Sequence, residues 1–162
     1  TIFWDREEDI TADSKNRVNW PFVRKWESTI ESNLQEAGQY NDQIYLRLAE
    51  TYLLKAEAQF LLGESANAAE TLNIIRERSN ASPISADEVS IEFILDERSR
   101  ELLYEERRRH TLLRTGKWLE RVRKFNHNGG QLAAERDRLF PIPQSVIDAN
   151  LTEEMNQNPG FN

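Results

Sequence analysis

A chain of 162 residues, 38% hydrophobic and 30% charged, has the composition of one globular domain with a core of its own. Its formal net charge of −7 argues against a nucleic-acid partner, because phosphate binding needs an excess of lysine and arginine on one face. No apolar run approaches the roughly 20 residues of a membrane-spanning helix, and there is no cysteine to form a disulfide or a thiolate metal site.

Residues 1–40 are the least regular part of the chain. Aromatic side chains alternate there with turn-forming residues, and neither a helical nor a strand period persists. Two interpretations stay open: the rings offer flat apolar faces on which sugars stack, or they fasten a long loop to the core. Under the first interpretation the candidate ligand-binding residues are Trp4, Trp20 and Trp26.

Residues 41–80 are predicted to form a helical hairpin, with helices near residues 42–62 and 65–79. Apolar residues recur along the first helix at spacings of three and four, as in an amphipathic helix. Gly63 can adopt the left-handed conformation that ends this helix, and Ser65 can cap the next one.

The facing surfaces of this hairpin contain small residues. Ala56 and Ala68 would let the two helices approach closely, as they do in a tetratricopeptide unit, so the hairpin is predicted to be of that type. The predicted inward residues are Leu46, Ala49, Leu53, Ala56 and Phe60 from the first helix, and Ala68, Leu72 and Ile75 from the second.

Residues 85–126 are predicted to contain the central helices. Ser85 and Glu88 form a capping box that precedes one helix near residues 91–114, and a shorter helix follows near residues 117–126. The apolar face of the shorter helix, predicted to lie in the core, consists of Trp118, Val122 and Phe125.

Charged residues occupy positions on helix 91–114 where an amphipathic helix would be apolar. Glu105 precedes Arg109 by four positions, a spacing that favours one continuous helix. If the charges are buried and paired with one another, removing one partner should cost about 3–5 kcal/mol, and if they are exposed each pair contributes under about 1 kcal/mol. The predicted network consists of Arg98, Glu101, Glu105 and Arg108.

Residues 127–162 are predicted to be mostly loop. The segment 139–143 should be extended around Pro141 and Pro143, since a residue before proline avoids the helical region. The tail from residue 150 onward has few apolar residues with which to pack.

The sequence predicts neither catalysis nor a cofactor. It has no glycine-rich phosphate loop, and its two histidines, His110 and His127, do not have a metal-ligand spacing. Acidic residues of segment 96–106 alternate with arginines, which lowers carboxyl pKa values and removes the proton that a glycosidase acid must donate. We therefore expect no enzyme, no cofactor and no bound metal.

Three blocks in the same order resemble the C-terminal part of the SusD/RagB family, whose members are glycan-binding lipoproteins of the Bacteroidetes outer membrane. The blocks are residues 44–58; residues 94–102 (Ile-Leu-Asp-Glu-Arg-Ser-Arg-Glu-Leu) with Glu105, Arg108 and residues 112–117; and residues 139–143 (Leu-Phe-Pro-Ile-Pro) with residues 157–161 (Gln-Asn-Pro-Gly-Phe).

The resemblance implies an all-α fold and a protein that binds oligosaccharide without chemistry. It also implies a SusC-like TonB-dependent transporter as partner, a place at the outer membrane on the cell surface, and attachment only through a lipid anchor upstream of this chain. The chain would then be a C-terminal fragment with millimolar affinity or none, and the charged residues of helix 91–114 would be structural. The alternative is a helical-repeat scaffold that binds another protein beside the hairpin of residues 41–80.

Overall fold

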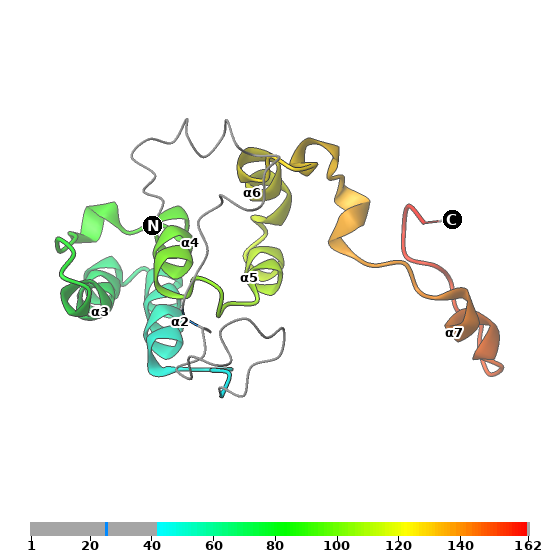
Figure 1. Cartoon of the computed structure of the whole chain (residues 1–162), viewed down its shortest axis with the longest axis horizontal. Helices are drawn as coiled ribbons and strands as arrows, with labels where there is room; N and C mark the ends of the chain where they lie inside the picture. Colours follow the sequence, from blue (N-terminus) through cyan, green and yellow to red (C-terminus); the bar gives the residue numbers. More distant parts are fainter. Residues whose placement is uncertain (1–24, 26–41, 162) are drawn as a thin grey trace, which may run out of the picture. The chain divides into compact units, whose positions relative to one another are not determined.

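The computed structural model describes residue 25 and residues 42–161. Over these residues it contains six α-helices and no strand, which confirms the all-α prediction (Figure 1). The chain divides into two compact units, residues 1–106 and residues 107–162. The single domain expected from the chain length stays a prediction.

The first unit begins with helix α2, Leu48–Leu61, which is shorter than the expected helix of residues 42–62. Leu46 was predicted to face inward, but it precedes the helix and is exposed. As predicted, Gly63 has the left-handed conformation just after the end of α2; its φ is 82°, and its N–H donates to the Phe60 carbonyl oxygen at 2.9 Å. A glycine adopts this conformation without the steric cost that a Cβ would bring.

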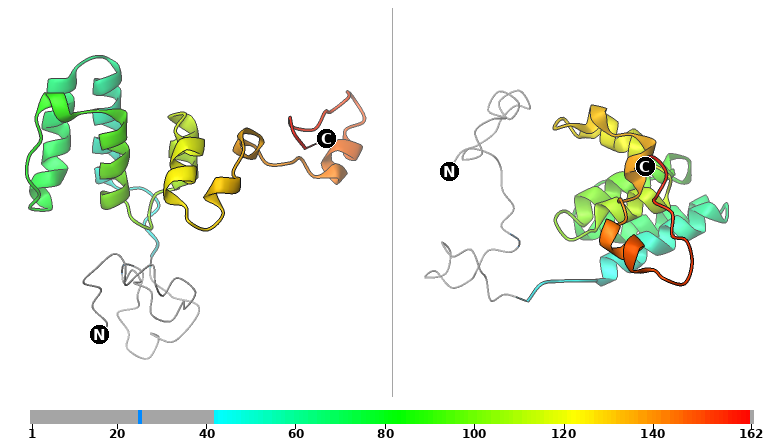
Figure 2. Two further views of the ribbon diagram at one scale, coloured as in Figure 1. Left: turned by 90° about the horizontal axis from the view of Figure 1, so that it is seen from above. Right: turned by 90° about the vertical axis from the view of Figure 1, so that its right-hand side faces the viewer.

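Helix α3, Ser65–Arg78, follows after a three-residue turn and packs along α2. The views of Figure 2 show α2, α3 and α4 side by side. Ser65 was predicted to cap α3, but it is the first helical residue, and Glu64 occupies the N-cap position without a side-chain cap. Glu64 instead accepts a hydrogen bond from Asn67 Nδ2 at 3.0 Å.

Helix α4, Ile91–Glu101, is preceded by a single 3₁₀ turn, Ala86–Glu88. The predicted Ser85 capping box caps this turn and not the α-helix. The cap of α4 is Ser90, whose hydroxyl accepts from the Phe93 N–H at 3.1 Å.

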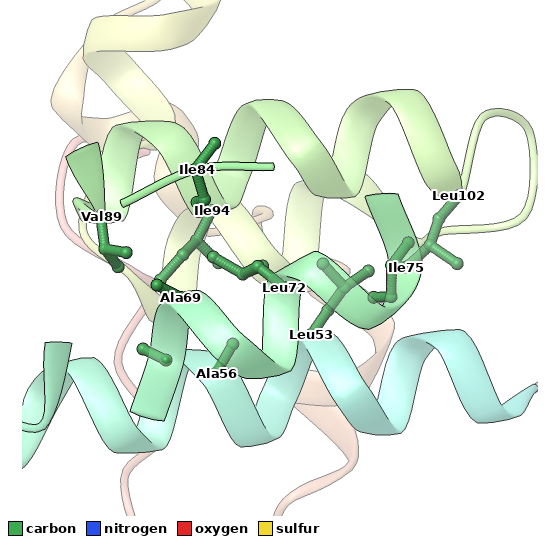
Figure 3. Close-up of a cluster of buried hydrophobic side chains, with 10 residues drawn as sticks. Leu53, Ala56, Ala69, Leu72, Ile75, Ile84, Val89, Ile94 and Leu102 are labelled. Carbon is green, nitrogen blue, oxygen red and sulfur yellow. The ribbon is translucent and has the colours of Figure 1, made fainter. Parts of the chain in front are cut away.

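The core of the first unit lies among α2, α3 and α4 (Figure 3). Leu53, Ala56, Ala68 and Leu72 are fully buried, in agreement with the predicted inward faces of the hairpin. Figure 3 shows side chains from all three helices pointing into one cluster. This cluster is completed by Ala69, Ile75, Ile84, Val89, Ile94 and Leu102.

The predicted continuous helix 91–114 is wrong. Helix α4 ends at Glu101, and helix α5, Arg108–Arg114, begins only after a turn. Within this turn Tyr104 has a φ of 61°, a left-handed conformation that is costly for a residue with a Cβ. The N–H groups of Glu105 and Glu106 both donate to the Leu102 carbonyl oxygen, at 2.9 and 3.0 Å.

The second unit contains α5, α6 (Trp118–Phe125), two 3₁₀ turns (Gly130–Leu132 and Glu135–Arg138) and α7 (Gln144–Ala149). As predicted, the α5 helix stops at Gly116, which has a φ of 70°. The unit has few buried side chains, among them Thr111, Leu112 and Trp118.

Candidate functional site

The predicted ligand-binding residues Trp4, Trp20 and Trp26 lie outside the described residues. Of the predicted charged network, Arg98, Glu101 and Glu105 belong to the first unit, and Arg108 is the first residue of α5 in the second unit. The described part of the candidate site is therefore the charged cluster around the C-terminal end of α4.

Arg98 is the most deeply buried charged residue of this cluster, with 1% of its surface exposed. Its Nε lies 2.5 Å from Glu106 Oε1, and its Nη2 lies 3.1 Å from Glu50 Oε1. Among the described residues, Arg98 Nη1 is a buried side-chain atom without a hydrogen-bond partner. The two carboxylates that neutralise Arg98 thus come from α2 and from the turn after α4, and neither belongs to the predicted set.

Arg47 makes the second centre of the cluster, just before the first residue of α2. Its Nε pairs with Glu105, its Nη1 lies 2.5 Å from Glu101 Oε1, and its Nη2 donates to the Glu101 carbonyl oxygen at 2.6 Å. Lys25 Nζ adds a second cation 2.6 Å from Glu105, and Arg78 Nη2 lies 2.7 Å from Glu101. Arg47 thus bridges two glutamate side chains and a main-chain carbonyl through charge-assisted hydrogen bonds, which are stronger than those between neutral groups.

A smaller ion-pair group is centred on Glu97, about one helical turn before Glu101 on α4. Glu97 Oε2 accepts from Arg76 Nη1 at 2.7 Å and from Arg100 Nη2 at 2.6 Å. Both guanidinium groups also lie over the ring of Phe93, at 5.5 and 5.7 Å from its centroid. The buried carboxylate of Glu97 is thereby neutralised by two cations.

The contacts of Arg47 and Lys25 with Glu105 lower the pKa of Glu105. Burial alone would raise this pKa, but hydrogen bonds from Arg47 and Lys25, together with their positive charges, outweigh burial and hold it below the ordinary glutamate value. The same balance acts on Arg47, whose pKa is raised by Glu105 and Glu101 against the effect of burial. Both groups are charged at neutral pH, so Glu105 has no proton to donate in acid catalysis.

The lowered pKa of Glu105 predicts a pH-dependent contribution to stability. A carboxylate with a depressed folded-state pKa stabilises the fold above its unfolded value of about 4.3, and this contribution is lost as the pH falls through the folded-state pKa. The gap in unfolding free energy between the unsubstituted protein and Glu105→Gln should therefore be widest near neutral pH and shrink below about pH 4.5. Urea unfolding at several pH values between 3 and 7 measures this gap.

The control for this experiment is Glu135→Gln, because the Glu135 side chain is exposed and should leave the unfolding free energy almost unchanged at every pH. A gap for Glu105→Gln that stays constant from pH 7 to pH 3 would contradict the prediction.

Exposed aromatic rings are more widespread than the sequence indicated. Phe125 was predicted to lie in the core, but 53% of its surface is exposed; Trp118 is buried as predicted. Tyr104 and Phe140 are 67% and 72% exposed, and Tyr45 is exposed as well. The described residues therefore also offer exposed aromatic rings.

Arg109, at the start of α5, contacts both α6 and the segment 137–140 within the second unit. Its Cζ lies 4.8 Å from the ring centroid of Trp118 and 4.6 Å from that of Phe140. Its Nη2 donates to the carbonyl oxygen of Asp137 at 2.5 Å and to that of Arg138 at 3.2 Å. Glu105, the partner expected for Arg109 in a continuous helix, instead bonds Arg47 and Lys25.

The closing block of the family resemblance folds back on the proline segment. Gln157 accepts from the Ile142 N–H at 2.7 Å and donates to the Ile142 carbonyl oxygen at 2.8 Å, and Asn158 donates to the Phe140 carbonyl oxygen at 2.7 Å. An open hollow of about 590 Å³ lies beside this contact, lined by Glu135, Arg136, Arg138, Leu139, Pro159 and Gly160.

The described residues contain neither a candidate metal site nor a membrane-spanning helix. Among residue 25 and residues 42–161, no group of three or more histidine, cysteine or acidic residues has an arrangement that could hold a metal ion. Within the same residues, every helix is too short or too polar to cross a bilayer.

The model of the SusD family matches residues 1–161 of the chain. The starch-binding protein SusD of Bacteroides thetaiotaomicron is 34% identical over 119 residues, which cover 71% of this chain and 21% of that protein. SusD-like protein P25 of Formosa agariphila is 32% identical over 117 residues, which cover 68% of this chain and 22% of that protein. No solved structure gives a significant match. The chain spans about a fifth of the length of these two relatives, and by its family match it belongs to the SusD family.

Proposed function

We propose that this chain is part of a non-catalytic protein that binds oligosaccharide for nutrient uptake. The observation that carries the proposal is the family match over residues 1–161, together with a relative named for starch binding. The charged cluster also supports binding without catalysis. Its described acidic residues are paired with arginine or lysine, so Glu105 is ionised and has no proton to give to a glycosidic oxygen. Binding without chemistry requires that the bound sugar is recovered intact.

We further propose that the whole protein works beside a SusC-like TonB-dependent transporter at the outer membrane, on the cell surface. This proposal rests on the family membership alone. Membrane attachment would come from a lipid anchor and not from the helices described here.

The charged cluster is proposed to be structural. Arg98 is buried, the side chains of Glu105 and Glu106 are 7% and 5% exposed, and each of the three is already bonded to an opposite charge. A sugar hydroxyl would therefore have to displace an existing charge-assisted hydrogen bond. The hairpin α2–α3 is proposed to be a tetratricopeptide-like unit, a reading that full burial of Ala56 and Ala68 supports. Such a unit is also the feature that would support the alternative of a protein-binding scaffold.

The proposed stacking surface comprises Trp4, Trp20 and Trp26. Indole rings offer the largest apolar faces to a pyranose ring, and two of these residues lie close to polar neighbours in the sequence, Asp5 and Arg6 beside Trp4 and Asn19 beside Trp20. The exposed rings of Tyr45, Tyr104, Phe125 and Phe140 are the competing positions in the described part.

Titration with maltoheptaose, followed by tryptophan fluorescence and calorimetry, tests the proposed function. We expect weak binding by this chain, with a Kd of about 1 mM, because the free energy of a small stacking surface is largely offset by the entropic cost of ordering the binding groups. Substitution of Trp4, Trp20 or Trp26 by alanine should weaken binding at least about threefold, since each stack contributes on the order of 1 kcal/mol.

The matched controls are Tyr104→Ala and Phe140→Ala, which remove exposed rings elsewhere and should leave the affinity unchanged. If the controls lose binding and the tryptophan variants do not, the stacking surface lies in the described part. Release of new reducing ends during incubation would show an enzyme, and absence of binding to every neutral and anionic glycan at millimolar concentration would overturn the proposed function.

A further inference from the structure

One asparagine of the chain is followed directly by glycine, namely Asn128 before Gly129. This pair lies in the turn between α6 and the 3₁₀ turn Gly130–Leu132 of the second unit. The side-chain amide carbon of an asparagine is within reach of the main-chain nitrogen of the next residue, which makes asparagine thermolabile in proteins. A glycine at the next position favours attack by that nitrogen, because it has no side chain to hinder the approach.

The structure leaves this pair accessible. Asn128 and Gly129 are both exposed and lie outside the α-helices, and Gly129 has a φ of 89°. The N–H groups on either side are engaged, because Asn128 donates to Asn126 Oδ1 and Gly130 donates to the Asn126 carbonyl oxygen, each at 3.0 Å. The Gly129 N–H, by contrast, donates to no main-chain carbonyl oxygen in the part of the chain that the structure describes. The attacking nitrogen is therefore not held by a main-chain hydrogen bond there.

Asn80 of the first unit is a matched comparison. It also lies in an exposed turn after a helix, but it precedes alanine, and the Ala81 N–H donates to the Arg76 carbonyl oxygen at 2.8 Å. The nitrogen that would attack the Asn80 side chain is therefore both hindered by a Cβ and hydrogen-bonded. Asn73 lies within α3, where helical hydrogen bonds fix the main chain. Neither asparagine combines exposure, an unhindered neighbour and an unbonded nitrogen as Asn128 does.

We propose that Asn128 is a site of spontaneous deamidation, at which the side-chain amide is converted to aspartate or isoaspartate; this inference does not depend on the proposed function. The Gly129 nitrogen attacks Cγ of Asn128, and the new N–Cγ bond closes a succinimide ring. The Cγ–Nδ2 bond breaks, and the proton displaced from the Gly129 nitrogen leaves with Nδ2 as ammonia. Solvent water then opens the ring, and no group is oxidised or reduced.

The two products change the turn in different ways. Water that adds at Cγ gives aspartate with an ordinary main chain, whereas water that adds at the main-chain carbonyl carbon gives isoaspartate, whose main chain is one atom longer. That atom lies between Asn126 and Gly130, which are joined by a hydrogen bond, and Gly130 already lies so close to the Val122 carbonyl group that a Cβ would meet its oxygen. Both products also place a carboxylate beside the C-terminal end of α6, where the helix dipole disfavours negative charge. Deamidation therefore weakens the packing of α6 on the Gly130–Leu132 turn.

The test incubates the full 162-residue chain in mildly alkaline buffer and follows each asparagine by peptide mass spectrometry, with enzymatic methylation to detect isoaspartate. We expect the acid to replace the amide at residue 128 at least about tenfold faster than at Asn80, whose next nitrogen is hindered and hydrogen-bonded. Asn128→Gln is the control, because closing a larger ring is slower and an exposed substitution should leave the fold intact. Equal rates at residue 128 and Asn80 overturn the proposal.

A parallel incubation in urea separates reaction in the native turn from reaction in the unfolded chain. If only unfolded molecules reacted, the native rate would be lower than the rate in urea by the equilibrium constant for unfolding, about a thousandfold or more. We expect the two rates at residue 128 to differ by less than about a thousandfold, because the native turn already leaves the Gly129 nitrogen unbonded in the described part. A larger difference overturns the proposal that the folded protein reacts.

Amide hydrogen exchange over residues 118–133 measures the structural consequence. We expect the incubated unsubstituted chain to lose protection in α6 and in the Gly130–Leu132 turn, and the incubated Asn128→Gln chain to keep it. A chain that is deamidated at residue 128 but fully protected over residues 118–133 overturns the predicted weakening of this packing. An equal loss of protection in incubated Asn128→Gln shows that another change is responsible and likewise overturns it.

Discussion

Replacing Arg98 by methionine should lower the free energy of unfolding by about 3–5 kcal/mol and the melting temperature by at least about 6 °C. Arg98 is almost completely buried, and its removal leaves the Glu106 carboxylate, which is itself 5% exposed, without the cation 2.5 Å away. A buried charge that loses its partner keeps the full cost of leaving water. Thermal and urea unfolding of Arg98→Met measure the loss.

Arg100→Met is the control on the same helix. The Arg100 side chain is 55% exposed and shares Glu97 with Arg76, so its loss should cost under about 1 kcal/mol. The double variant Arg98→Met with Glu106→Gln should be more stable than Arg98→Met alone, because it also removes the buried negative charge that Arg98 neutralises. Equal melting of Arg98→Met and the unsubstituted protein would contradict the burial of this pair.

Gly130→Ala should destabilise the second unit by about 1–3 kcal/mol, the usual cost of overpacking. A Cβ at Gly130 would meet the Val122 carbonyl oxygen and lie 3.2 Å from the Val122 carbonyl carbon. That oxygen accepts the Asn126 N–H at 3.0 Å at the end of α6, so a displaced backbone loses this hydrogen bond. Amide hydrogen exchange over residues 118–138, together with thermal unfolding, reports the effect.

Leu132→Ala is the neighbouring control, because the Leu132 side chain is 85% exposed and its truncation should change stability by under about 0.5 kcal/mol. Gly130→Ser should be at least as damaging as Gly130→Ala, since it adds a further atom to the same crowded position. Unchanged exchange rates in Gly130→Ala would contradict the prediction, because they would show that α6 and the Gly130–Leu132 turn can move apart without a loss of stability.

The hairpin and the helix ends were predictable because their signals are local. Alternating spacings of three and four place Leu53 and Leu72 inward, and Gly63 and Gly116 end their helices in the left-handed conformation that a glycine adopts without strain. Such signals depend only on neighbouring residues, so the sequence alone carries them. The Ser65 cap was misplaced by one residue, which is within the usual uncertainty of a helix end.

The break between α4 and α5 was not predictable, because it depends on contacts between residues that are distant in the sequence. Residues 94–114 contain neither glycine nor proline, and the spacing of Glu105 and Arg109 favours an unbroken helix. In the structure Glu105 and Glu106 bond Arg47 and Arg98 instead, and Arg47 lies more than 50 residues away in the sequence. Tertiary ion pairs outweigh the local preference, and Tyr104 takes a strained φ as a result.

The exposure of Phe125 was not predictable from the sequence. Helical spacing assigns Phe125 to the same face as Trp118, but α6 ends at Phe125, where the last turn meets solvent and two cations cover the ring. Periodicity describes which residues share a face and not how far the core extends along it.

The pairing of Arg47 with Glu105 joins positions 58 residues apart in a chain of 162 residues without cysteine. A disulfide across such a loop would stabilise mainly by restricting the unfolded chain, and it would persist after the fold had opened. An ion pair leaves the unfolded chain unrestricted, so the entropy lost in closing the loop must be offset by native contacts each time the first unit folds. The loop is therefore closed by an ion pair that exists only in the folded state and is lost when the first unit unfolds.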